Sequence, residues 1–83
     1  MYKILIPIQP FLKEQNINYY DNKNNLIGTD TCTLKALPDF CNKLSKENND
    51  LSYIVLKNYQ EFSNGIAKKI RSEISDQIRV ITE

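Results

Sequence analysis

Apolar side chains alternate along residues 2–8, where Ile4, Ile6 and Ile8 share one face of a predicted strand. Leu5 and Pro7 make the other face apolar too, which is typical of a central strand covered on both sides. Proline has no N–H to donate to a neighbouring strand and is usually confined to edges, strand ends or bulges. We therefore expect a central first strand whose pairing breaks or bulges near Pro7.

Two short strands are predicted next, at residues 17–20 and 25–29. The segment between them is rich in Asp and Asn, residue types that tolerate turns and left-handed conformations. The pattern therefore predicts a hairpin. Because Tyr19 and Tyr20 are adjacent, their side chains must point to opposite sides of the second strand.

Two amphipathic helices are predicted from apolar positions that lie three and four residues apart. In the first helix, these positions are Leu34, Leu37, Phe40, Cys41 and Leu44. Pro38 must lie in the first turn, so this helix begins between Leu34 and Leu37. In the second helix, the apolar stripe consists of Tyr59, Phe62, Ile66, Ile70 and Ile74. The second helix begins at Asn58 or at Ser63, because a Ser-Asn-Gly segment weakens its first turn.

Residues 51–56 form an apolar run without alternation, as in a strand covered on both faces. Residues 77–82 give a less apolar strand, expected at an edge, with Ile78 and Val80 on one face. Right-handed crossovers place the fourth strand parallel to the first and the fifth beyond it, while the hairpin extends on the other side. We therefore predict an α/β fold with a five-stranded mixed sheet in the order 3-2-1-4-5. Along the chain, the elements follow as three strands, a helix, a strand, a helix and a strand.

This layout resembles the ribonuclease H-like fold over nearly the whole chain, through its topology. The opening segment YKILIPI, residues 2–8, also resembles the first strand of the nitrogenase iron–molybdenum-cofactor accessory domains, which share that fold. The resemblance implies that metal-binding carboxylates would follow the first and fourth strands, as in the nuclease members. Gln9 and the pair Lys57-Asn58 stand there instead, and neither an amide nor an ammonium replaces an anionic Mg²⁺ ligand. We therefore expect the fold without the two-metal reaction.

The charged and reactive residues exclude several function classes. The net charge of +1 gives no overall field toward nucleic acid or acidic lipid. The chain has no histidine, which removes the commonest general base and every Ser-His or Cys-His pair. Cys32 and Cys41 are too few to hold zinc or an iron–sulfur cluster, and we interpret them as buried free thiols. We therefore predict a non-enzymatic protein with no catalytic residue, no metal and no cofactor.

The length of 83 residues predicts one domain, residues 1–83, with one core. Its apolar runs are far shorter than the roughly 20 residues that span a bilayer, and we recognise no signal peptide. We therefore expect a cytoplasmic protein with no membrane partner. Abundant Ile, Asn and Lys with little Arg is typical of an AT-rich genome, and indicates a low-GC bacterium or one of its phages or plasmids.

Our leading hypothesis is a small non-catalytic module that binds a protein partner. It would use an exposed sheet edge, the loop with Phe11 and Leu12, or a helix face, and a second copy of the chain is one such partner. A phage or mobile-element accessory protein of this kind would occlude a host protein. The candidate contact residues are Gln9, Phe11, Leu12, Tyr19, Tyr20, Lys57 and Asn58. Tyrosine is enriched in interface hot spots, although cross-strand packing is the plainer interpretation of both tyrosines.

Two further hypotheses stay open. A nucleic-acid-binding remnant of the ribonuclease H-like fold would place phosphates against Lys68, Lys69 and Arg71, with Lys57 in support. A solvated helix face is the plainer interpretation of that basic group. A small ligand could also bind at the carboxyl ends of the first and fourth strands, where open α/β sheets commonly hold ligands. The polar groups there would be Gln9, Lys57, Asn58 and Asn64.

Overall fold

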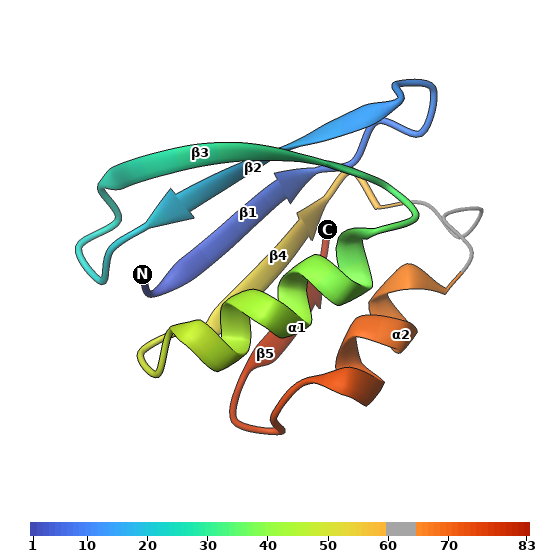
Figure 1. The fold of residues 1–83 in the computed structure, drawn as a ribbon. Helices are drawn as coiled ribbons and strands as arrows, with labels where there is room; N and C mark the ends of the chain where they lie inside the picture. Colours follow the sequence, from blue (N-terminus) through green and yellow to red (C-terminus); the bar gives the residue numbers. More distant parts are fainter. Residues whose placement is uncertain (60–64) are drawn as a thin grey trace.

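The structure is a computed structural model that describes residues 1–59 and 65–83. Its elements are β1 (Lys3–Pro7), β2 (Glu14–Tyr20), β3 (Leu26–Thr33), α1 (Leu37–Glu47), β4 (Tyr53–Lys57), α2 (Ile66–Glu73) and β5 (Arg79–Thr82). The strands form a mixed sheet in the order β3-β2-β1-β4-β5 (Figure 1). β1 and β4 are parallel, as are β4 and β5, whereas β2 is antiparallel to both of its neighbours. The predicted α/β class and strand order are therefore confirmed.

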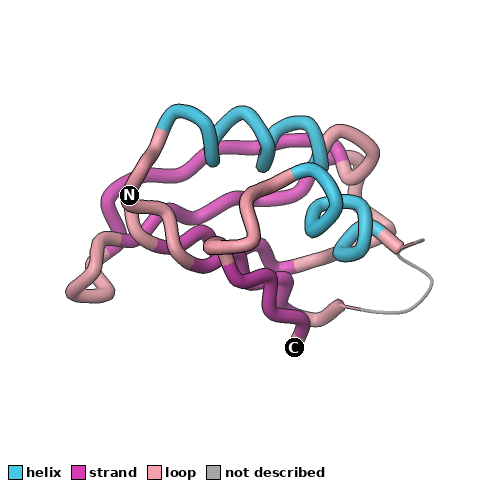
Figure 2. The backbone as a smooth tube through the Cα atoms, turned by 90° about the horizontal axis from the view of Figure 1, so that it is seen from below, coloured by secondary structure: helices cyan, strands magenta, loops and turns pink. Residues whose placement is uncertain are grey.

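The hydrophobic core lies between one face of the sheet and the two helices, which both lie on that side (Figure 1, Figure 2). Ile4 and Ile54 are fully buried and pair in register across the two central strands. The buried core residues of the strands and helices include Ile4, Ile6, Ile17, Ile54, Leu56, Leu37, Cys41, Ala67 and Ile70. Alternation along each strand therefore sends every second side chain into this core and the others to the opposite face.

We call the sheet face opposite the helices the open face. By alternation and register, its residues in β1, β4 and β5 are Lys3, Leu5, Pro7, Tyr53, Val55, Lys57, Arg79 and Ile81. Its residues in β2 and β3 are Glu14, Asn16, Asn18, Tyr20, Leu26, Thr29, Thr31 and Thr33. The two described helices leave this face uncovered.

The prediction that β1 and β4 are covered on both faces is therefore wrong. Leu5, Val55 and Ile81 lie side by side on the open face, in register across β1, β4 and β5. Val55 is only 7% exposed although it lies outside the core cluster, because its neighbours in the adjoining strands shield it. The unbroken apolar sequence of the central strands thus supplies a narrow apolar strip, and not a second helix-covered layer.

The predicted break in pairing at Pro7 is confirmed. β1 pairs with β4 as far as Pro7, but its pairing with β2 ends at Leu5 and Asn18. The Ile8 N–H donates to the Lys57 carbonyl in the direction of β4, so the preceding amide position faces β2. Pro7 has no N–H to offer on that side, and the two strands separate there.

β2 and β3 are both longer than predicted, because their pairing continues to Glu14 and Thr33. These added positions are mostly polar and carry no apolar alternation in the sequence. The hairpin itself is confirmed, since Asp21 Oδ1 accepts the N–H groups of Lys23 and Asn25 at 2.9 and 2.8 Å. Asn24 has a φ of 66°, in the left-handed region that asparagine tolerates.

α1 begins at Leu37 with Pro38 in its first turn, as predicted. α2 begins at Ile66, preceded by Gly65 in the left-handed region with a φ of 68°. Asn58 also has a positive φ, 58°, instead of the extended conformation of an N-cap, so the second helix does not begin there. The alternative start at Ser63 lies outside the described residues. Neither described helix is long and apolar enough to cross a membrane.

Candidate functional site

The predicted contact residues lie at two opposite ends of the sheet. At one end, the loop after β1 meets the end of β4, where the Ile8 N–H donates to the Lys57 carbonyl at 2.8 Å. Five predicted residues gather in these two segments: Gln9, Phe11, Leu12, Lys57 and Asn58. Tyr19 and Tyr20 pair instead with Ile4 and Lys3 at the start of β1. Asn64, from the ligand hypothesis, lies outside the described residues.

The loop after β1 is fixed by a buried glutamine. Gln15 is 1% exposed, and its side chain reaches back to the loop backbone. Its Oε1 accepts the Gln9 N–H at 2.7 Å, and its Nε2 donates to the carbonyls of Gln9 at 2.8 Å and Leu12 at 3.2 Å. The Leu12 N–H also donates to the Gln9 carbonyl at 2.9 Å. The sequence analysis did not identify Gln15, because burial of a single polar residue leaves no pattern along the chain.

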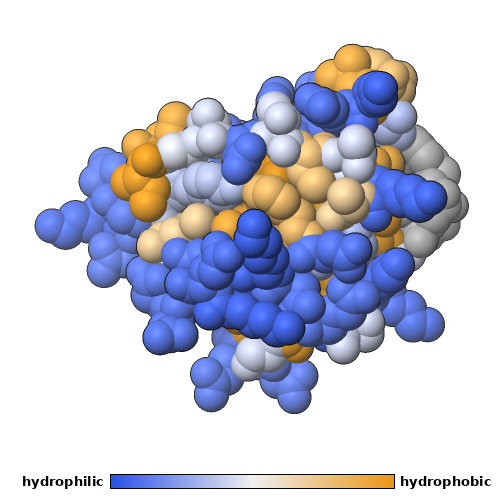
Figure 3. All heavy atoms as spheres, viewed as in Figure 1, coloured by the Kyte–Doolittle hydropathy of each residue, from blue (hydrophilic) through white to orange (hydrophobic). Residues whose placement is uncertain are grey.

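The same loop presents the most exposed large apolar side chain among the described residues. Phe11 is 84% exposed and Leu12 is 43% exposed. Figure 3 shows the corresponding hydrophobic protrusion at the upper right, where the β1–β2 loop lies in Figure 1. Leu26 and Ile27, at the start of β3, form a second exposed apolar pair at 57% and 53%. These two apolar pairs lie near opposite ends of β2.

Tyr19 and Tyr20 point to opposite sides of β2, as predicted. Tyr19 packs against the core on the helix side, and its hydroxyl donates to Asp30 Oδ2 at 3.4 Å. Burial, with the negative charge of Asp30, raises the pKa of Tyr19 to about 12. Tyr20 lies on the open face, where the Lys3 ammonium sits 4.8 Å from its ring centroid. Of the two tyrosines, Tyr20 is the one placed for contact on the open face.

The basic group on α2 does not form a single patch with Lys57. Lys68, Lys69 and Arg71 are exposed on α2, which covers one side of the sheet (Figure 2). Lys57 is exposed, and the strand register places it on the other side. Arg71 already has a partner, since its Nη2 donates to the Val80 carbonyl of β5 at 2.8 Å. One N–H donor of Arg71 is therefore used within the protein, at the edge strand β5.

One row of open-face residues alternates aromatic and cationic side chains across four strands. Lys3 pairs in register with Tyr20 of β2 and with Tyr53 of β4, and Tyr53 pairs with Arg79 of β5. We call Tyr20, Lys3, Tyr53 and Arg79 the aromatic-cation row. Lys3 Nζ also donates to Asn24 Oδ1 at 2.7 Å. Of this row, the sequence analysis identified only Tyr20. Lys3, Tyr53 and Arg79 are distant in sequence, and only the pairing of β1, β4 and β5 brings them together. Aligning YKILIP with SYIVLK as parallel neighbours would have placed Lys3 beside Tyr53.

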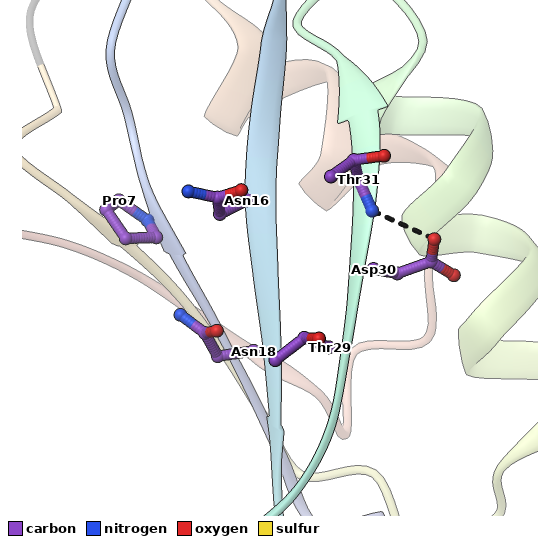
Figure 4. Close-up of a pocket in the computed structure, with 6 residues that line it drawn as sticks. All are labelled: Pro7, Asn16, Asn18, Thr29, Asp30 and Thr31. Carbon is purple, nitrogen blue, oxygen red and sulfur yellow. Dashed lines mark hydrogen bonds between the residues drawn. The ribbon is translucent and has the colours of Figure 1, made fainter.

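A shallow hollow of about 460 Å³ lies farther along the open face (Figure 4). It is lined by Pro7, Asn16, Asn18, Thr29, Asp30 and Thr31. The end of the β1–β2 pairing at Leu5 opens this space. The Asp30 carboxylate points away from the other residues, and its Oδ1 accepts the Thr31 N–H at 2.8 Å. The remaining polar side chains are amides and hydroxyls, which both donate and accept hydrogen bonds.

The two cysteine thiols both have raised pKa values and are therefore poor nucleophiles at neutral pH. Cys41 is buried and Cys32 is half-buried, and both are free. Burial raises the pKa of Cys41 to about 12, and burial with the charge of Asp30 raises the pKa of Cys32. A raised thiol pKa lowers the fraction of reactive thiolate at neutral pH. Within residues 1–59 and 65–83, no three His, Cys, Asp or Glu side chains are placed to hold a metal ion.

Comparisons with protein-family models, with curated proteins and with solved structures found no match to this chain. The fixed loop and the open face are therefore interpreted from their own geometry.

Proposed function

We propose that this chain is a small non-catalytic interaction module that binds a protein partner through the β1–β2 loop. The observation that carries the proposal is an 84% exposed Phe11 on a loop whose backbone is held by the buried Gln15. Large aromatic side chains are typical anchors of protein interfaces. A loop that is already ordered loses less conformational freedom on binding, which favours association.

The surroundings of Phe11 support a partner with an apolar pocket and a polar rim. Leu12 adds a second exposed apolar side chain beside it. Lys57 and Asn58 lie at the same end of the sheet and are both exposed. Protein interfaces commonly combine an apolar centre with such a polar periphery.

The test uses the purified chain as bait in a nuclease-treated extract of a low-GC bacterium. We expect the unaltered chain to capture a protein that Phe11→Ser loses. Ile27→Ser is the matched control, because it removes an apolar side chain that is 53% exposed at the start of β3. The proposal is wrong if Phe11→Ser retains every captured protein, or if both variants lose the same ones.

Light scattering during size-exclusion chromatography tests whether the partner is a second copy of the chain. If it is, the unaltered chain should be a dimer and Phe11→Ser a monomer of unchanged fold. A monomer in both cases assigns the captured protein to a different partner.

A further inference from the structure

The aromatic-cation row has the composition of a stacking platform with charges between its rings. Tyr20 and Tyr53 lie on β2 and β4, on either side of Lys3, and Arg79 follows on β5. Neighbouring strands are about 4.8 Å apart, so the backbone positions of the row span roughly 14 Å and those of the two tyrosines lie roughly 10 Å apart. The Tyr53 ring also meets Tyr2 edge-on, with centroids 5.5 Å apart at 62°. The Tyr53 ring is therefore packed against a second aromatic ring.

The charges on this face have a positive excess. The strands place three cations here, Lys3, Lys57 and Arg79, against Glu14, and Glu83 follows at the end of β5, two residues after Ile81. Lys3 uses one of its three N–H donors on Asn24, so further donors remain for a ligand. The face therefore attracts anions locally although the net charge of the chain is only +1.

We propose that the open face binds single-stranded nucleic acid, with bases stacked on Tyr20 and Tyr53 and phosphates against Lys3, Lys57 and Arg79. Sheet faces that recognise RNA use aromatic side chains in this way to stack two or three bases. Stacking requires bases that are free of a duplex, which selects single strands. The amides and hydroxyls of the adjoining hollow can hydrogen-bond to base edges (Figure 4).

Charge complementarity favours this occupant over a protein. Lysine is depleted from the centres of protein interfaces, yet Lys3 lies between the two tyrosines of the row. A polyanion that also carries flat aromatic bases satisfies the cations and the rings together. This site goes beyond the proposed protein contact at Phe11 and shares only Lys57 with it.

The test measures fluorescence anisotropy of labelled single strands of about 12 nucleotides, as DNA and as RNA, with a duplex of the same sequence for comparison. We expect the single strands to bind more tightly than the duplex. Their affinity should fall as salt rises from about 50 to 200 mM. Tyr53→Ala should weaken binding about tenfold, whereas Tyr53→Phe, which keeps the ring, should retain it.

The cations are tested separately by their effect on the salt dependence. Arg79→Gln and Lys57→Gln should each reduce the slope of log affinity against log salt by about 0.7. Lys68→Gln and Lys69→Gln are the matched controls on α2 and should leave the slope unchanged. The proposal is overturned if single strands do not bind at about 50 mM salt, if the duplex is preferred, or if only the α2 variants weaken binding.

Two further controls separate this proposal from the others. Polyglutamate is negatively charged like an acidic protein but has no bases. If the chain binds polyglutamate more tightly than the single strands, the nucleic-acid proposal is wrong. Phe11→Ser should bind the single strands normally, and its failure to do so would contradict the placement of the nucleic-acid site on the open face. Far-ultraviolet circular dichroism of each variant shows that any loss is not caused by unfolding.

Discussion

The two faces of the sheet are built from the same five strands but differ in composition. The helix side contains fully buried isoleucines such as Ile4 and Ile54, while the open face places Lys3 and Tyr53 at the positions immediately before them. Alternation thus separates a surface that is buried under the helices from one that the two described helices leave uncovered. Substitutions one residue apart in sequence should therefore affect different properties of the protein.

The largest difference should appear when the same substitution is made on each face. Ile6→Ala empties a fully buried site between the sheet and the helices, and should lower the free energy of unfolding by about 2–5 kcal/mol. Ile81→Ala removes a side chain that is already 36% exposed, and should lower it by about 1 kcal/mol or less. Urea denaturation measures both values, and equal losses would contradict the separation of the faces.

The next prediction concerns the buried polar residue of the helix side. Gln15→Leu removes the partners of the Gln9 N–H and of the carbonyls of Gln9 and Leu12, and should cost about 1–3 kcal/mol of stability. It should also loosen the loop, so amide exchange in residues 8–13 should accelerate. Asn16→Leu, on the exposed open face, is the control. Unchanged exchange in Gln15→Leu would show that the loop does not depend on this side chain.

The sequence was sufficient to predict the order of the sheet, because each strand and helix has a local signal. Apolar runs mark the central strands, the Asp-Asn segment marks the hairpin, and Pro38 marks the start of α1. Crossover handedness then determines the order of the strands. The ends of β2 and β3 could not be predicted, since Gln15 is buried through its hydrogen bonds to the loop and gives no apolar pattern.

Less of the candidate site could be predicted, because its residues are brought together by pairing between distant strands. Phe11 and Leu12 were identified as an apolar pair in a polar loop, and the structure shows them exposed. Lys3 and Arg79 are far apart along the chain, and only the register through Tyr53 places them in one row. Hydrophobic periodicity indicates which side of a strand faces the core, but it does not align one strand with the next.

A smaller effect should distinguish two arginines that lie on different parts of the molecule. Arg71 donates to the Val80 carbonyl, so Arg71→Met should lower stability by about 1 kcal/mol. No hydrogen bond of the Arg79 side chain with the described residues is seen, so Arg79→Met should change stability by about 0.5 kcal/mol at most. Thermal and urea denaturation of both variants measure this difference. A larger loss in Arg79→Met would mean that the open face contributes to folding as well as to the proposed binding.

The smallest effect should come from the ionisation of Tyr19, the tyrosine on the helix side. Its pKa is raised to about 12, above the ordinary value of 10.0 that applies in the unfolded chain. The unfolded state therefore loses its proton first, and the contribution of Tyr19 to stability is complete below pH 10 and disappears as the pH rises toward 12. Cys41 ionises in the same range, so the comparison needs Tyr19→Phe, which removes only the ionisable hydroxyl and keeps the ring. Between pH 10 and 12 the free energy of unfolding should fall less steeply in Tyr19→Phe than in the unaltered chain. Equal slopes in urea denaturation would show that folding does not raise the pKa of Tyr19.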